Sequence, residues 1–205
     1  MPNSYSVFYF DKFGRCEPIR LVFAYAGVEY EDKRISNEEW KLIKSDQPFQ
    51  QIPVLIVNKT IKIAQTPAIL CYLGSQFNLI GKNEIERAAV FQYLLGLVDL
   101  LYALKHAFLG KDPKDIAQNM RELIDVDISR FLKNYDNFYA LNKSVCLVGD
   151  TVTVADIAII HWVWFFNQRY HVEITPYPHL KKAFDSLLSN SNIKNYLKIR
   201  KETDW

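Results

Sequence analysis

The pattern of apolar residues changes once along the chain, near residue 80. Every segment with the aromatic and β-branched composition of a strand lies before residue 65, and from residue 82 onward apolar residues recur only at helical spacing. Because a sheet and a group of helices each bury their apolar faces within packed layers, this change predicts two domains. Polar residues around Gly81 mark the boundary, so we expect a small α/β domain at 1–80 and an all-α domain at 83–205.

The first domain is predicted to run strand, helix, strand, short helix, two strands, helix. Residues 5–10 have strand composition, and residues 17–26 place their apolar side chains on one helical face that ends at Gly27. Ser36 and Glu39 have the spacing of a capping box. The other elements expected here are an extended segment at 28–35, a hairpin at 53–57 and 60–63, and a helix from Thr66, its N-cap, to about Gln76.

Helices alone are predicted for the second domain. The chain has only 7 glycines and 8 prolines, which favours long helices over a loop-rich β fold. Asp112-Pro113 and Thr153 with Asp156 are helix-start signals. The expected helices span 84–110, 112–140, 153–166, 177–188 and 191–199.

Composition narrows the class of protein. Lys and Arg number 25 against 23 Asp and Glu and are scattered, so we expect no nucleic-acid partner. The longest uninterrupted apolar runs have six residues, against the roughly 20 of a membrane helix. The amino terminus lacks the pattern of a signal peptide, and the three cysteines are widely spaced. We therefore expect a soluble cytoplasmic protein with no membrane partner.

Most enzyme motifs are absent from the sequence. It has no G-x-G-x-x-G, no P-loop and no G-x-S-x-G, and its four histidines lack metal-ligand spacing, so no metal is expected. Three features remain, each with a plainer structural interpretation. Tyr9 lies near a strand end, where α/β sheets bind ligands, or it is a core aromatic residue. Pro53 forms a cis bond that exposes the backbone N–H of Ile52, or it only begins a strand. Thr66 begins a helix whose N-terminus suits a carboxylate, or it is a simple N-cap.

Six segments, in order and at matching distances, resemble the cytosolic glutathione transferases, and among these the sigma class, which includes glutathione-dependent prostaglandin D synthases. The segments are Tyr9–Arg20, Tyr30–Arg34, Trp40–Lys44, Pro48–Pro53, Gln65–Leu73 and Gly149–Asp156. The resemblance implies a thioredoxin-like first domain, an all-α second domain that contributes the hydrophobic substrate site, glutathione as co-substrate, and a homodimer. In the family, Thr153 and Asp156 form a structural capping box.

The resemblance also implies the roles of individual residues. Tyr9 is the catalytic hydroxyl. The residues implied to bind glutathione are Tyr9, Arg15, Trp40, Lys44, Gln51, Ile52, Pro53, Gln65 and Thr66, with Asp99 supplied by the partner subunit. The residues implied for the hydrophobic substrate are Phe10, Tyr102, His106, Trp162 and Trp205, although Tyr102 and Trp162 also fit core positions. Thr66 replaces the usual serine, and His106 stands about where the prostaglandin synthases carry a tryptophan.

A tyrosine hydroxyl is sufficient for the implied chemistry. A thiol with a pKa of ~8.5 must lose about two pKa units to be ionised at neutral pH, which requires ~2.7 kcal/mol. One hydrogen bond to a charged acceptor contributes ~1.5–3 kcal/mol, and the helix start beside Arg15 adds ~0.3–1 kcal/mol. Tyr9 is therefore interpreted as a hydrogen-bond donor to the thiolate.

The leading functional hypothesis is a detoxifying transferase that joins glutathione to small hydrophobic electrophiles. A second is an isomerase that uses the same thiolate on prostaglandin H2 and leaves glutathione unconsumed. A third makes Cys16 the working thiol of an oxidoreductase, because it lies near a helix start. A fourth is a non-catalytic carrier of hydrophobic ligands.

Overall fold

A mixed four-stranded sheet organises the N-terminal part of the chain. Its strands are β1 (Tyr5–Phe10), β2 (Glu31–Ile35), β3 (Val54–Val57) and β4 (Ile61–Ala64), in the spatial order β2-β1-β3-β4. β1 pairs parallel with β2 and antiparallel with β3, which in turn pairs antiparallel with β4. The computed structural model describes residues 3–203. Within them, the strands and the hairpin predicted from the sequence are confirmed.

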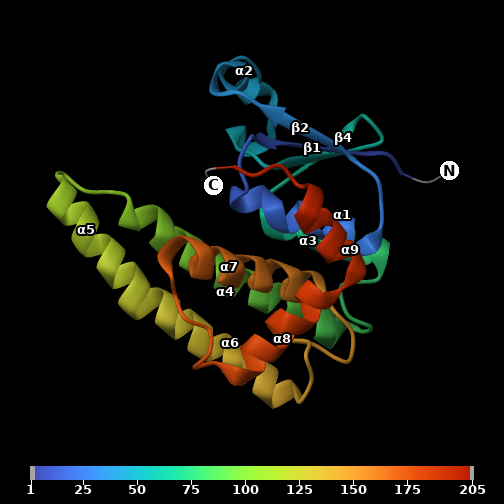
Figure 1. The fold of residues 1–205 in the computed structure, drawn as a ribbon. Helices are drawn as coiled ribbons and strands as arrows, with labels where there is room; N and C mark the ends of the chain where they lie inside the picture. The colour runs from blue at the N-terminus through green and yellow to red at the C-terminus, as the bar shows by residue number, and fades with distance from the viewer. Residues whose placement is uncertain (1–2, 204–205) are drawn as a thin grey trace. The chain divides into compact units, whose positions relative to one another are not determined.

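Helices cover both faces of this sheet. The helices of this region are α1 (Glu17–Ala26), α2 (Asn37–Ile43) and α3 (Thr66–Phe77), with short turns η1 (Gly14–Cys16), η2 (Lys44–Asp46) and η3 (Pro48–Gln50). α1 and α3 pack together on one face, and α2 lies on the other (Figure 1). Side chains alternate between the two faces of β1, so Tyr5 and Val7 both point into the core. There the Tyr5 ring packs on Phe23 of α1, with ring centroids 5.3 Å apart.

For the helices of this region, the predicted start and end signals hold except at one cap. α1 ends at Gly27, whose φ of 65° is the left-handed conformation expected there, and Ser36 and Glu39 form the capping box of α2. Thr66 was predicted as the N-cap of α3, but that position belongs to Gln65. The Thr66 hydroxyl donates instead to the carbonyl of Arg15, at 3.1 Å, so a distant part of the chain determines its role.

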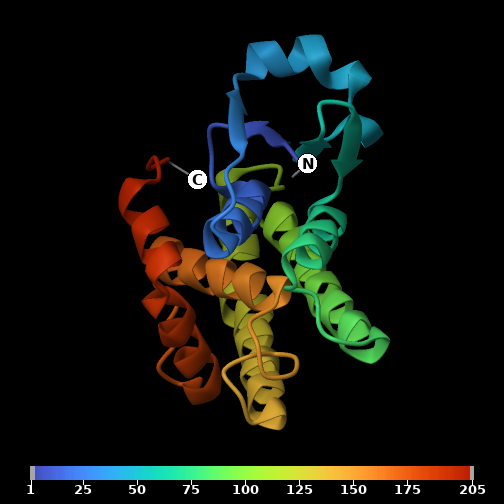
Figure 2. The same cartoon turned by 90° about the vertical axis from the view of Figure 1, so that its right-hand side faces the viewer.

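The remaining helices form an all-helical unit. They are α4 (Glu84–Ala107), α5 (Pro113–Glu122), the π-helical stretch η4 (Leu123–Ile128), α6 (Ser129–Asn142), α7 (Val154–Tyr170) and α8 (Pro178–Ser189). α7 is buried along most of its length, begins with the predicted Thr153–Asp156 capping box, and forms the centre of the unit. α4 and α6 lie side by side (Figure 2), where the Tyr135 hydroxyl donates to the Tyr93 carbonyl at 2.6 Å.

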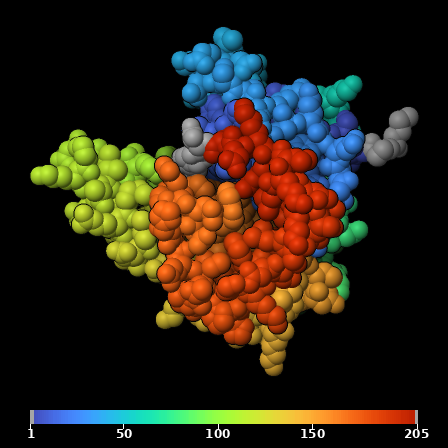
Figure 3. Space-filling view, viewed as in Figure 1, coloured from blue at the N-terminus to red at the C-terminus, as the bar shows by residue number. Residues whose placement is uncertain are grey.

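The two compact units differ in one respect from the predicted domains. One unit runs to Leu79 and also includes the chain from Ser189 onward, while the other is Ile80–Leu188. The last helix, α9 (Ser191–Ile199), was expected in the second domain, but it packs against α1, as the dark red and blue surfaces in Figure 3 show. Asn192 donates to the Tyr25 carbonyl at 3.2 Å. Helical spacing within α9 carries no information about this distant partner.

α4 is more apolar as a whole than the short apolar runs of the sequence indicate. Among the described residues it is the one helix long and apolar enough to cross a membrane, with a mean hydropathy of 1.4 over its most apolar window, of which 33% is buried. Polar residues such as Gln92 and Asp99 interrupt its apolar runs. Because α4 packs along α5, η4 and α7, we interpret it as a core helix of the helical unit that also presents an apolar stripe on its surface.

Candidate functional site

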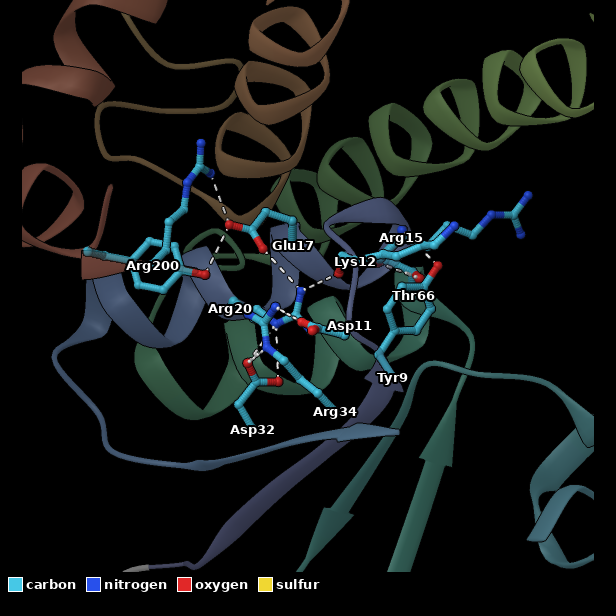
Figure 4. A network of polar contacts seen from close by, with 11 residues as sticks. Tyr9, Asp11, Lys12, Arg15, Glu17, Arg20, Asp32, Arg34, Thr66 and Arg200 are labelled. Carbon is cyan, nitrogen blue, oxygen red and sulfur yellow. Dashed lines mark hydrogen bonds and ion pairs between the residues drawn. The ribbon is translucent and has the colours of Figure 1, made fainter. Parts of the chain in front are cut away.

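The hydroxyl of Tyr9 lies inside the turn that follows its own strand. β1 ends at Phe10, the chain reverses, and the backbone N–H of Arg15 donates to the Tyr9 hydroxyl oxygen at 3.2 Å (Figure 4). Because this contact uses a lone pair on the oxygen, the single hydroxyl proton of Tyr9 is directed elsewhere. The arrangement therefore presents a neutral O–H donor at the end of β1.

Burial keeps this hydroxyl protonated. The pKa of Tyr9 is raised above its ordinary value, chiefly by burial and in spite of the opposing hydrogen bond from Arg15. The phenol thus remains a hydrogen-bond donor throughout the neutral range.

Gly14 makes the turn around Tyr9 possible. Its φ is +42°, and a Cβ added there would lie 2.6 Å from the Tyr9 hydroxyl oxygen and 3.0 Å from the ring carbon Cε1. Both the backbone conformation and the space therefore require glycine. Gly14 lies within the Tyr9–Arg20 segment of the family resemblance, but its contact with Tyr9 could not be predicted from the sequence.

The start of α3 lies against the same turn. The Thr66 hydroxyl donates to the Arg15 carbonyl at 3.1 Å, so Arg15 is held by Tyr9 at its N–H and by Thr66 at its C=O (Figure 4). Gln65 adopts a φ of 71°, which is uncommon for a residue with a side chain and is typical of binding sites. Its side-chain amide donates to the Gln51 side chain at 3.2 Å. The structure thus brings Tyr9, Arg15, Gln51, Gln65 and Thr66 into one region.

The other implied glutathione-binding residues lie on the connection between β2 and β3. The Ile52–Pro53 peptide bond is cis, which is the alternative that the sequence left open. Trp40 of α2 packs edge-on against Phe10 with ring centroids 6.3 Å apart, which places α2 next to the end of β1. Lys44 follows directly at the C-cap of α2 and is exposed.

The implied residues of the helical unit divide into exposed and buried ones. Tyr102 is 55% exposed on α4, and His106 lines a cavity of about 340 Å³ bounded by α4, α5 and η4. Asp99 is exposed and lines a second cavity, of about 330 Å³, between α4 and α6. Trp162 is only 2% exposed and packs on Phe165, with ring centroids 5.2 Å apart. Of its two interpretations, the core residue is therefore the correct one. Trp205 lies outside the described residues.

Cys16 does not fit the thiol-oxidoreductase hypothesis. Its side chain is fully buried, and burial raises the pKa of the thiol to about 12. A catalytic cysteine needs an accessible thiolate, so this alternative was wrong. Within residues 3–203, no group of three or more His, Cys, Asp or Glu side chains is arranged to hold a metal ion.

Replacing Gly14 with alanine tests the turn around Tyr9. The new methyl group would force the Tyr9 hydroxyl from its place, so we expect the transferase activity that the resemblance implies to fall roughly ten- to a hundredfold, as on removal of a transition-state donor. Gly27→Ala is the matched control, because Gly27 also has a positive φ, +65°, but its added Cβ would meet only Asn192 at 3.7 Å. Equal losses of activity in the two variants, measured on folded protein, would contradict a specific role of Gly14.

Comparison with known proteins identifies the family of this chain. Family models described as "Glutathione S-transferase, N-terminal domain" and "Glutathione S-transferase, C-terminal domain" match residues 5–75 and 98–200. The chain is 33% identical to glutathione S-transferase 4 of Caenorhabditis elegans, over 99% of both chains.

Two solved structures extend the likeness to the whole fold. One is prostaglandin synthase D of Nilaparvata lugens, with a TM-score of 0.89 and 27% identity over 98% of this chain and 100% of that one. The other is the glutathione S-transferase Na-GST-3 of Necator americanus, with a TM-score of 0.90 and 31% identity over the same shares. With both domain models matched and relatives aligned along the full length, this chain belongs to the glutathione S-transferase family.

Proposed function

We propose that the Tyr9 hydroxyl donates a hydrogen bond to the sulfur of bound glutathione and keeps it ionised for attack on an electrophile. The observation that carries this proposal is the contact between the Arg15 N–H and the Tyr9 oxygen. A donor on that oxygen polarises the O–H bond, which makes the proton a stronger donor to an anion. Charge-assisted hydrogen bonds of this kind are the strong ones in proteins.

The raised pKa of Tyr9 indicates which of the two groups, the phenol or the thiol, gives up its proton. Because burial disfavours the phenolate, Tyr9 keeps its proton while glutathione loses one. Tyr9 therefore acts as a donor that stabilises the thiolate. Attack of the thiolate on an electrophilic carbon forms the carbon–sulfur bond, and the leaving group departs with the bonding electron pair.

We propose that glutathione is held by the remaining residues of the first unit. Arg15, Trp40, Lys44, Gln51, Ile52, Pro53, Gln65 and Thr66 form this proposed set. The N-terminus of α3 offers backbone N–H groups and the positive end of its dipole, which suits a carboxylate of the tripeptide. The pairing of Gln51 with Gln65 supports a binding surface that draws on two separate segments of the chain.

For the second substrate we propose small hydrophobic electrophiles, consistent with detoxification in the cytoplasm. In the helical unit, the exposed Tyr102 and His106 beside its cavity remain candidates for this role. Trp162 is not included, because it packs in the core of the helical unit. The free state of Cys16, Cys71 and Cys146 supports a reducing compartment.

A second candidate activity is isomerisation of prostaglandin H2 by a sigma-class enzyme. It is favoured by the structural likeness to the protein titled prostaglandin synthase D. By the family resemblance, His106 stands about where sigma-class prostaglandin synthases carry a tryptophan, so we place conjugation before isomerisation.

We also propose a homodimer that forms over α4. Phe91 and Leu95 are 46% and 45% exposed, and they lie on one stripe of the helix with Asp99 and Tyr102. A partner subunit on this stripe would bring Asp99 towards the partner's glutathione. The Necator americanus relative is titled monomeric, so the oligomeric state of this chain has to be measured.

The Tyr9→Phe variant tests the mechanism. We expect glutathione binding to persist, the pKa of the bound thiol to rise by roughly one to two units, and turnover to fall about ten- to a hundredfold, because one charge-assisted hydrogen bond is lost. In the wild type, kcat/KM rises as the thiol ionises below neutrality and shows no decline from Tyr9 in the neutral range, since burial raises the pKa of Tyr9 above its ordinary value. Ultraviolet absorbance of the bound thiolate against pH measures the shift. An unchanged thiol pKa would remove Tyr9 from the mechanism.

Product analysis distinguishes the two activities. Incubated with glutathione and an aryl halide, the enzyme is expected to consume one glutathione for each conjugate formed. With prostaglandin H2 an isomerase would form prostaglandin D2 and leave the glutathione concentration unchanged. Isomerisation faster than conjugation would reverse the order of the two candidates, and glutathione binding without either product would favour the carrier hypothesis.

Replacing Phe91 and Leu95 together with lysine tests the dimer. We expect the wild type to sediment as a dimer and the double variant as a folded monomer, because charges are disfavoured at the centre of an interface. The KM for glutathione should then rise as the partner's Asp99 is lost. Ile85→Lys, on the same helix but outside the stripe, is the control. A monomeric wild type would overturn the proposal.

A further inference from the structure

The turn that follows β1 contacts the segment directly after α9. We call residues 11–14 the tyrosine loop, since they connect the strand of Tyr9 to Arg15. The Arg200 guanidinium lies 4.5 Å from the centre of the Phe13 ring, and Lys201 forms an ion pair with Asp11. Both basic residues follow α9 directly, so the C-terminal segment contacts this loop at two points.

The same segment is anchored to a buried carboxylate. Glu17 is fully buried at the start of α1, where one carboxylate oxygen accepts from Arg200 and from the Tyr196 hydroxyl, each at 3.0 Å (Figure 4). Its other oxygen accepts from Arg20 at 3.1 Å. A charge removed from water is tolerated only with such partners, so the three donors are held firmly in place. The Arg200 side chain is itself only 8% exposed.

Two arginines of the first unit also form hydrogen bonds with the tyrosine loop. Arg20 donates to the Lys12 carbonyl at 2.8 Å, and Arg34 donates to Asp11 at 2.9 Å. Hydrogen bonds from Lys201 and Arg34 hold the pKa of the Asp11 carboxyl below its usual value, so it is ionised at neutral pH. Arg200 lies over the ring of Phe13, the residue directly before Gly14.

The path from Arg200 to the Tyr9 hydroxyl is short. Phe13 is buried, and its carbonyl accepts from the Glu17 N–H at 3.0 Å at the start of α1. The next residue, Gly14, lies against the Tyr9 hydroxyl, and the one after it donates the N–H of Arg15 to that oxygen. A displacement of the Phe13 ring would therefore move the peptide that orients Tyr9.

We propose that Arg200 is a positioning residue for Tyr9, acting through Phe13 and Gly14. It fixes the tyrosine loop by lying on the Phe13 ring while it pairs with the buried Glu17. This inference rests on the proposed role of Tyr9 as the donor to the thiolate of glutathione. It adds a residue of the C-terminal segment, distant in sequence from every residue implied to bind glutathione, to the determinants of the thiol pKa.

The Arg200→Gln variant tests the proposal through the pKa of bound glutathione, measured by thiolate absorbance against pH. We expect this pKa to rise by roughly half a unit to one unit, because hydrogen bonds to charged acceptors weaken steeply with misalignment. Arg200→Lys should rescue part of the effect, since it keeps a cation beside Glu17 and Phe13. Lys198→Gln removes the same charge from an exposed position on α9 and should leave the thiol pKa unchanged.

A double-mutant cycle separates positioning from general destabilisation. In the Tyr9→Phe background, Arg200→Gln should cause no further rise of the thiol pKa, because the group on which it acts is absent. An equal rise in both backgrounds, or none in the wild-type background, would overturn the proposal. If Arg200→Gln does not fold, Phe13→Leu removes the ring and keeps the Glu17 pair, and the same rise is expected.

The test also distinguishes this inference from the proposed function. If Tyr9→Phe leaves the thiol pKa unchanged, the role of Tyr9 fails and the inference fails with it. If Tyr9→Phe raises the pKa and Arg200→Gln does not, the function stands and only the positioning role is lost.

Discussion

The hydrogen bond from the Arg15 N–H to the Tyr9 oxygen is the contact on which the site depends. It joins β1 to η1, the turn directly before α1, and Thr66 of α3 donates to the carbonyl of the same Arg15. Three elements of the first unit therefore meet at one residue. Gly14 allows the contact, because any side chain there would occupy the space of the hydroxyl.

Around this contact lies a network of charges whose role is geometrical. Arg20 is fully buried and bonds to Glu17, to Asp32 and to the Lys12 carbonyl, and Arg34 links Asp32 to Asp11. Buried ion pairs contribute little net stability, because the cost of desolvation offsets much of the attraction. Their value here is that each carboxylate has directional partners from separate segments, which restricts the tyrosine loop to one conformation.

The two units have different parts in the proposed chemistry. The first unit contains the donor and the residues proposed to bind glutathione, within a sheet and helices that leave its turn little freedom. The helical unit supplies the exposed face of α4, and its core helix α7 buries Trp162. A thiolate stabilised in the first unit serves either substitution or isomerisation, so the choice between them depends on the surroundings of the second substrate, to which Tyr102 and His106 are proposed to contribute.

The sequence by itself determined the elements and the class of fold. Periodicity and caps are local signals, so they located β1, α1, the α2 capping box and the start of α7 to within a few residues. The family resemblance supplied Tyr9 and the proposed glutathione-binding residues. Only the tertiary structure decided that Thr66 bonds to Arg15, that Trp162 is a core residue, that Cys16 is too deeply buried to react, and that Arg200 lies on Phe13. These outcomes depend on contacts between residues far apart in the chain, and a periodic pattern contains no information about which distant side chain will meet which.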